Sequence, residues 1–175
     1  MRRKATISGL ILMTIVLILT ASVSAEWTVN SSKDPMTGNE KWVAKSSYAV
    51  ATEEMEFPYH NVEAWIEVVC ENGATNVKIG FSNGPNLMNT SLHQDGYEII
   101  DTRIKWDDEI EEIRLNHDYA SKYIDFRNDN DIIEKLKNHN TLLLELNWFA
   151  EDEVYFEFSL DNSQEAVNEI QEHGQ

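Results

Sequence analysis

The chain has very little cysteine, and its charge is almost all of one sign. Cys70 is the only cysteine among 175 residues, so no disulfide can form within one copy and stability must come from packing. Lys and Arg number 14 against 31 Asp and Glu, which gives a formal net charge of −17. Such a charge repels the phosphates of nucleic acids and anionic membrane surfaces, so we expect no nucleic-acid partner.

Signatures of catalysis and of metal binding are also missing. The sequence contains no nucleophile elbow, phosphate-binding loop, HExxH or CxxC motif, and its five histidines share no helical or strand spacing. Asp125, Asp129, Asp131 and Glu134 lack the central glycine and the spacing of a calcium loop. A solvated acidic loop is therefore favoured over calcium binding, which stays the alternative. We predict no catalytic residue, no metal ligand and no cofactor.

The N-terminus has the pattern of a cleavable signal peptide. Three basic residues at positions 2–4 precede an apolar run over residues 10–19. This run is too short to span a membrane, which takes about 20 apolar residues. Small residues follow, and Val23 and Ala25 fit the positions that signal peptidase reads. We predict cleavage between Ala25 and Glu26, no stable membrane anchor afterwards, and a periplasmic or secreted location. A retained N-terminal anchor is the alternative.

Cleavage would leave residues 26–175 as a single domain. This stretch of 150 residues contains no repeat and no Pro/Gly/Ser linker, and its length suits one hydrophobic core. Cleavage removes three basic residues and no acidic one, so the net charge becomes −20. A surface of this kind tolerates salt and attracts cations or a basic partner.

Alternation of apolar and polar residues predicts a mainly β domain. The clearest strand covers residues 62–70, and a return strand over 75–81 follows an Asn72-Gly73 turn. Further strands are expected over 42–50, 97–106, 141–149 and 154–158, with another strand pair as one reading of 113–126. Short helices are expected over 132–137, capped by Asn130 or Asp131, and from an Asn162/Glu165 capping pair to Gly174.

About seven short strands separated by turns, with two short helices, favour an antiparallel β-sandwich or a barrel-like domain. The alternative is an α+β single antiparallel sheet with helices on one face.

Arg103, Trp106 and Trp65 are the candidate binding residues. Arg103 is one of few basic residues and sits mid-strand, with Asp101 and Lys105 on the same face. Its guanidinium could anchor an anionic ligand or a partner carboxylate, or it could pair with an acidic residue on a neighbouring strand. Trp65 and Trp106 also lie within strands, where an indole serves either for packing or as a binding platform.

Several segments resemble the TagO/VasI family, which is associated with type VI secretion. Trp27 and a Ser/Asp/Pro turn follow the predicted signal peptide; residues 66–73 are similar to the family's apolar strand ending in cysteine, and residues 102–107 to its Arg-and-Asp strand. Residues 156–161 are similar to the strand that leads into its Ala/Ile helix. Family members carry a second cysteine after the last helix, a partner for the first, whereas residues 171–175 contain none.

The resemblance implies an exported, non-enzymatic accessory or binding protein of the cell envelope with a protein partner. Two alternatives stay open from the sequence. One is a small exported hydrolase that uses carboxylates on glycans, and the other is a phage- or toxin-linked interaction factor of the envelope.

Overall fold

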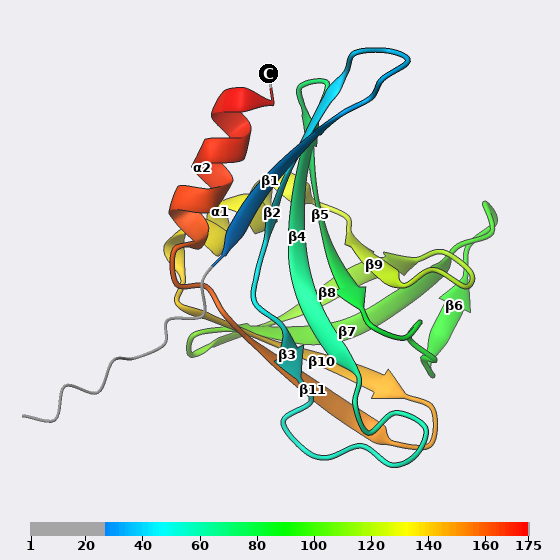
Figure 1. Ribbon diagram of the computed structural model, residues 1–175. Helices are drawn as coiled ribbons and strands as arrows, with labels where there is room; N and C mark the ends of the chain where they lie inside the picture. Colours follow the sequence, from blue (N-terminus) through cyan, green and yellow to red (C-terminus); the bar gives the residue numbers. More distant parts are fainter. Residues whose placement is uncertain (1–26, 175) are drawn as a thin grey trace, which may run out of the picture.

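The computed structural model describes residues 27–174, so the predicted cleavage between Ala25 and Glu26 lies outside the described residues. The elements are β1 (Thr28–Lys33), β2 (Glu40–Lys45), β3 (Ala49–Val50), β4 (Glu63–Glu71), β5 (Ala74–Phe81), β6 (Thr90–Leu92), β7 (Glu98–Trp106), β8 (Glu109–His117), β9 (Tyr123–Phe126), α1 (Asp129–Asn138), β10 (Thr141–Trp148), β11 (Asp152–Ser159) and α2 (Ser163–His173) (Figure 1). Within this part of the chain no helix has both the length and the apolar character needed to span a membrane.

Tight turns place consecutive strands next to one another. β4 and β5 pair from Ala64 opposite Phe81 down to Glu71 opposite Ala74. The turn residues Asn72 and Gly73 have φ angles of 52° and 76°, the positive values that favour Asn-Gly in a two-residue hairpin loop. β7 and β8 are also joined through only two residues, 107–108. The pairing therefore follows from local turn chemistry.

The strands form one antiparallel sheet that bends without closing into a barrel. Its order is β1-β2-β4-β5-β9-β8-β7-β10-β11, with β3 on β4 and β6 on β7. The β11 edge returns to β3, where an isolated bridge joins Ala51 to Phe156 and the Thr52 N–H donates to the Tyr155 carbonyl. In Figure 1, β1, β2, β4 and β5 form one arm of the bend, while β7, β10 and β11 form the other.

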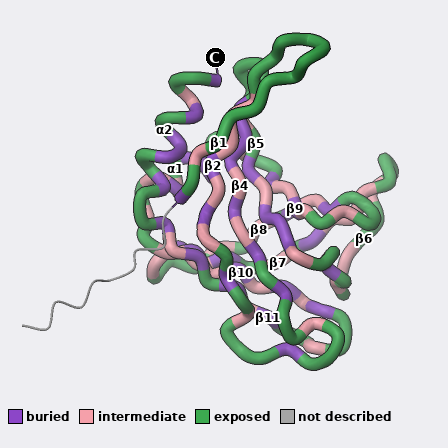
Figure 2. Tube along the Cα trace, viewed as in Figure 1, coloured by how far each residue is buried: buried purple, intermediate pink, exposed green. Residues whose placement is uncertain are grey.

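The core lies inside this bend. Every second side chain of β4 and β10 points into it, and Figure 2 shows the resulting alternation of buried and less buried positions along the strands. Trp148, Phe81 and Phe156 meet there with ring centroids 5.6–6.1 Å apart, a spacing at which aromatic pairs add to the burial energy. The three rings join the two arms of the sheet.

The two helices lie together beside the sheet (Figure 1). Each buries residues at the i, i+3 and i+4 spacing of an amphipathic helix. These residues are Ile132, Ile133 and Leu136 in α1, and Ala166, Val167 and Ile170 in α2. The Ser163 hydroxyl of α2 also donates to the Leu136 carbonyl of α1 at 2.5 Å, which ties the helices to one another.

Three local predictions about helix and strand ends need correction. The N-cap of α1 is Asn128 rather than Asn130 or Asp131, because Asp129 accepts a 2.8 Å hydrogen bond from the Val77 N–H and fixes the first turn against β5. Asn162 precedes α2 but makes no side-chain capping bond. The strand predicted over 42–50 is split into β2 and β3 at residues 46–48.

The prediction of a mainly β fold with antiparallel strands and two short helices is confirmed. The strand pair considered for 113–126 corresponds to β8 and β9, and Gly174 follows the end of α2 as expected.

Candidate functional site

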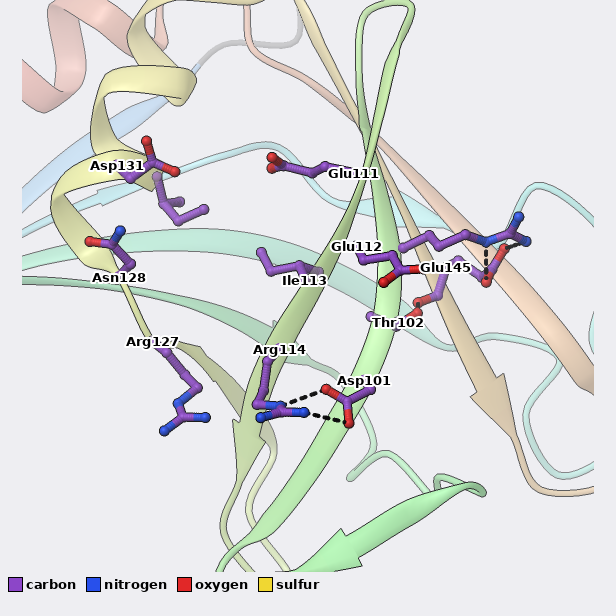
Figure 3. A pocket seen from close by; sticks show the side chains of 12 residues that line it. Asp101, Thr102, Glu111, Glu112, Ile113, Arg114, Arg127, Asn128, Asp131 and Glu145 are labelled. Carbon is purple, nitrogen blue, oxygen red and sulfur yellow. Dashed lines mark hydrogen bonds and ion pairs between the residues drawn. The ribbon is translucent and has the colours of Figure 1, made fainter.

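A groove of about 900 Å³ lies between the β7–β8 hairpin and the start of α1. Figure 3 shows side chains from both sides converging on it. Only three arginines occur after residue 3, and all three line this groove: Arg103 from β7, Arg114 from β8, and Arg127 from the residues between β9 and α1. Although the chain has a net charge of −17, all the guanidinium groups of the described residues thus lie around one groove.

Two of these arginines are held by carboxylates in a forked geometry. Arg103 donates from Nε to Glu145 Oε1 on β10 at 3.0 Å and from Nη2 to Glu145 Oε2. Arg114 donates to both carboxylate oxygens of Asp101 on β7, at 2.6 and 3.0 Å. Each fork uses two of the five N–H donors of a guanidinium, so both groups keep donors for a ligand.

These contacts keep the groups charged. The hydrogen bond from Arg114 holds the pKa of Asp101 below its usual range, and the Glu145 carboxylate raises the pKa of Arg103. Both arginine side chains are 53% exposed, so a ligand in the groove can reach them.

Arg127 has no such partner. Among the described residues its side chain makes no hydrogen bond or ion pair, and Figure 3 shows it in the groove beside Arg114. Its charge is close enough to Asp101 to contribute to the lowered pKa of that carboxyl. Arg127 is therefore the cation of the groove that is least neutralised by the protein itself.

At the opposite end of the groove, Lys135 of α1 forms ion pairs with two carboxylates. Its Nζ lies 2.5 Å from Glu111 Oε2 on β8 and 3.5 Å from Asp131 Oδ2. Glu111 also accepts a 2.8 Å hydrogen bond from Trp106 Nε1. Burial alone raises the pKa of Glu111, but the hydrogen bonds from Lys135 and Trp106 outweigh it and the net pKa is lowered. Glu112 is the one lining carboxylate without an ion pair among the described residues.

The structure separates the three sequence candidates. Arg103 lines the groove, and its predicted pairing with an acid on a neighbouring strand is confirmed by Glu145. Trp106 is only 2% exposed and lies below the groove, where its indole supports Glu111.

Trp65 lies on β4 and does not line the groove. Its ring packs on Gly80, where a Cβ atom would come within 2.5 Å of it. Lys45 Nζ lies 4.0 Å from the ring centroid, and Glu67 accepts the indole N–H at 2.7 Å. The ring and the N–H group of Trp65 are thus already in contact with other residues of the protein itself.

Arg114 and Arg127 were missed as candidates. The sequence did contain a signal, since they and Arg103 are the only arginines that follow the predicted signal peptide. Their proximity depends on the β7–β8 register, which sets Asp101 opposite Arg114, and on the turn of the chain into α1.

Within residues 27–174 no group of three or more His, Cys, Asp or Glu side chains is arranged to hold a metal ion. In the acidic cluster considered for calcium, Asp129 is bonded to the Val77 N–H and Asp131 is paired with Lys135. No family model, no curated protein and no solved structure matches the chain.

Proposed function

We propose that this protein is an exported, non-enzymatic binding protein of the cell envelope, and that its groove holds carboxylates of a protein partner. The observation that carries the proposal is the gathering of Arg103, Arg114 and Arg127 along one groove of a strongly acidic chain. Guanidinium groups bind carboxylates through paired N–H donors, and they are frequent where such groups must be recognised.

The ionisation of the groove supports binding rather than acid catalysis. A glycosidase needs a carboxylic acid that keeps its proton at working pH, which requires a raised pKa. The pKa values of Asp101 and Glu111 are shifted in the opposite direction. These carboxylates stay ionised and keep Arg114 and Lys135 in place.

The export part of the proposal rests on the N-terminal sequence. A basic start, a short apolar run and small residues before Ala25 are typical of a cleavable signal. The contact between Cys70 and Gly174 supports the TagO/VasI resemblance, because it brings the end of α2 to the cysteine of β4. A second cysteine after the last helix would lie at this contact.

The proposal is tested by affinity capture from an envelope extract with the chain 26–175 as bait. Arg127→Ala should lose the captured partner, because it removes the unpaired cation of the groove. Lys33→Ala is the matched control: it removes one positive charge from the β1–β2 hairpin, where Lys33 pairs only with Glu40 at the surface. Equal capture by both variants would contradict the proposal.

A further inference from the structure

His117 is the one buried side chain among the described residues that can carry a positive charge. It ends β8, is only 4% exposed, and lies opposite Glu98 of β7 and Ile124 of β9. Its Nδ1 is 3.1 Å from Glu98 Oε2, and its Nε2 is 3.1 Å from the carbonyl oxygen of Ser121. The ring therefore joins β7 to residues 118–122, which connect β8 to β9.

These two contacts need one proton more than a neutral imidazole supplies. A carbonyl oxygen and an ionised carboxylate only accept hydrogen bonds, whereas a neutral imidazole carries a single N–H. Both contacts become hydrogen bonds when the ring is doubly protonated, or when Glu98 carries a proton and donates it to Nδ1. In either form the pair of His117 and Glu98 holds one additional proton. Without that proton, one of the two contacts has no hydrogen to share.

Residues 118–121 adopt a conformation that the backbone alone does not favour. Ala120 has a φ angle of 60°, in the left-handed region where the Cβ atom of a residue other than glycine is crowded by the backbone. Among the described residues only the His117 ring donates to the Ser121 carbonyl. The residue that follows is fixed separately, because its carbonyl accepts an N–H group from β5. Loss of the ring contact would thus free residues 118–121 while β9 keeps its place.

The charged groups around the ring are mostly acidic. Glu98 faces it from β7, Asp118 follows it directly in the chain, and β6 carries no charged residue. Burial raises the pKa of Asp125 on β9, while nearby cations act in the opposite direction, His117 among them. Two lysines on this side of the sheet have other partners: Lys78 pairs with Glu67 at 3.5 Å, and Lys122 donates to the Ser82 carbonyl at 2.9 Å. The surroundings therefore suit a group that carries an additional proton.

We propose that His117 and Glu98 form a proton-dependent latch for residues 118–121. With the additional proton the latch is closed, and the ring joins β7 to the connection between β8 and β9. As the pH rises and the proton leaves, one of the two contacts is lost and the segment moves away from the ring. Histidine changes its charge between about pH 5 and pH 8, and a coupled pair titrates as a unit. The latch lies outside the lining of the groove and does not depend on the proposed function.

The test follows the backbone of the chain 26–175, labelled with ¹⁵N, from pH 5 to pH 9. The order parameters of residues 118–121 should fall in a single transition from about 0.85 to below about 0.6 as the pH rises, while those of β8 and β9 stay unchanged. His60→Gln is the control. The ring of His60 is exposed, stacks on Phe57 and makes no hydrogen bond among the described residues, so this variant should show the same transition.

Glu98→Gln separates the latch from any general effect of pH. The glutamine N–H donates to Nδ1, the Nε2–H of a neutral ring donates to Ser121, and the side-chain oxygen still accepts the Thr90 hydroxyl. All contacts are then made without the additional proton, so residues 118–121 should stay ordered at pH 9. Order parameters at 118–121 that do not change with pH in the unsubstituted protein would overturn the latch. An equal fall in Glu98→Gln and in the unsubstituted protein would overturn it as well.

Discussion

Cys70 on β4 is in contact with Gly174 at the end of α2. The thiol donates to the Gly174 carbonyl across 3.4 Å, and the same carbonyl accepts the Gly73 N–H at 3.0 Å. A Cβ atom built on Gly174 would lie 2.4 Å from Cys70 Sγ and 2.8 Å from its Cβ. The C-terminal helix is thereby fixed to the β4–β5 turn, and the absence of a side chain at Gly174 is what allows this approach.

Gly174→Cys should form a disulfide with Cys70 under oxidising conditions. The two Cβ atoms need to separate by only about 1 Å to reach the usual 3.5–4.5 Å. Closing a loop of roughly 100 residues can then stabilise the fold by up to about 4–5 kcal/mol. Thiol counting and urea unfolding measure both effects. Gly174→Ser, which adds a similar side chain but no bond, is the control and should be destabilised. Two free thiols after oxidation would contradict the account.

The native Cys70 thiol should react slowly with labelling reagents. It is 2% exposed and free of disulfide bonds, and a buried free cysteine behaves as a small apolar residue. The substitution Cys70→Ser should lower the free energy of unfolding by less than about 1–2 kcal/mol, which is the cost of burying an unpaired hydroxyl. The loss is smaller because the Gly174 carbonyl is available as an acceptor. Rapid labelling of the folded protein, with unfolded protein as reference, would show that the thiol is not buried.

Acid should destabilise the fold below about pH 4.5. The folded pKa of Glu111 lies below its usual value of 4.5. The folded pKa of Asp107 lies below its usual value of 3.8, because hydrogen bonds from residues 139–141 outweigh the effect of burial. Unfolded Glu111 therefore binds protons more readily than folded Glu111, so its stabilising effect is present above pH 4.5 and is lost as pH falls through the folded pKa. In the variant Glu111→Gln, the melting temperature should fall by less between pH 6 and pH 3 than it does in the unsubstituted protein. An equal loss would show that Glu111 is not stabilised as an anion.

Breaking the Arg103–Glu145 pair should have a small effect on stability. Arg103 is 53% exposed, and exposed ion pairs contribute about 0–1 kcal/mol. Urea unfolding of Arg103→Ala should therefore shift by no more than this amount. A loss of several kcal/mol would mean that Glu145 becomes an uncompensated buried charge.

Salt should raise the melting temperature without any specific effect of calcium. The net charge of −17 makes the folded chain repel itself, and salt at physiological strength screens charges over about 8–10 Å. Sodium chloride should give most of the gain. Calcium at matched ionic strength should add nothing beyond magnesium, because Asp129 and Asp131 already have partners within the protein. A calcium-specific increase that Asp131→Asn abolishes would establish a metal site.

The sequence predicts the hairpins better than the edges of the sheet. β4 and β5 combine strict alternation with an Asn-Gly turn, and both signals are local. β1 was missed because five of its six residues are exposed, so its pattern lacks an apolar face and it is placed by pairing with β2. α1 was predicted too short because its first turn is fixed by Asp129 bonding to β5, a contact between residues far apart in the chain.

The groove was only partly predictable for the same reason. Arg103 could be identified as unusual from its place in a strand. The sequence could not show that Arg127 lies near Arg103, because this proximity requires β9 to stop after four residues and the chain to turn into α1. Local patterns carry no information about such a turn in space.

The arginine side chains give the most direct test of the central claim. The chain 26–175 contains only three arginines, and all three line the groove, so the Nε–Hε region of a ¹⁵N spectrum should contain three signals that each report on the site. Titration with a capped peptide that carries one carboxylate, Ala-Glu-Ala, should shift the Arg127 and Arg114 signals in a saturable manner, and added salt should weaken the binding. Three signals that stay unchanged at millimolar peptide, at low salt, would contradict the account.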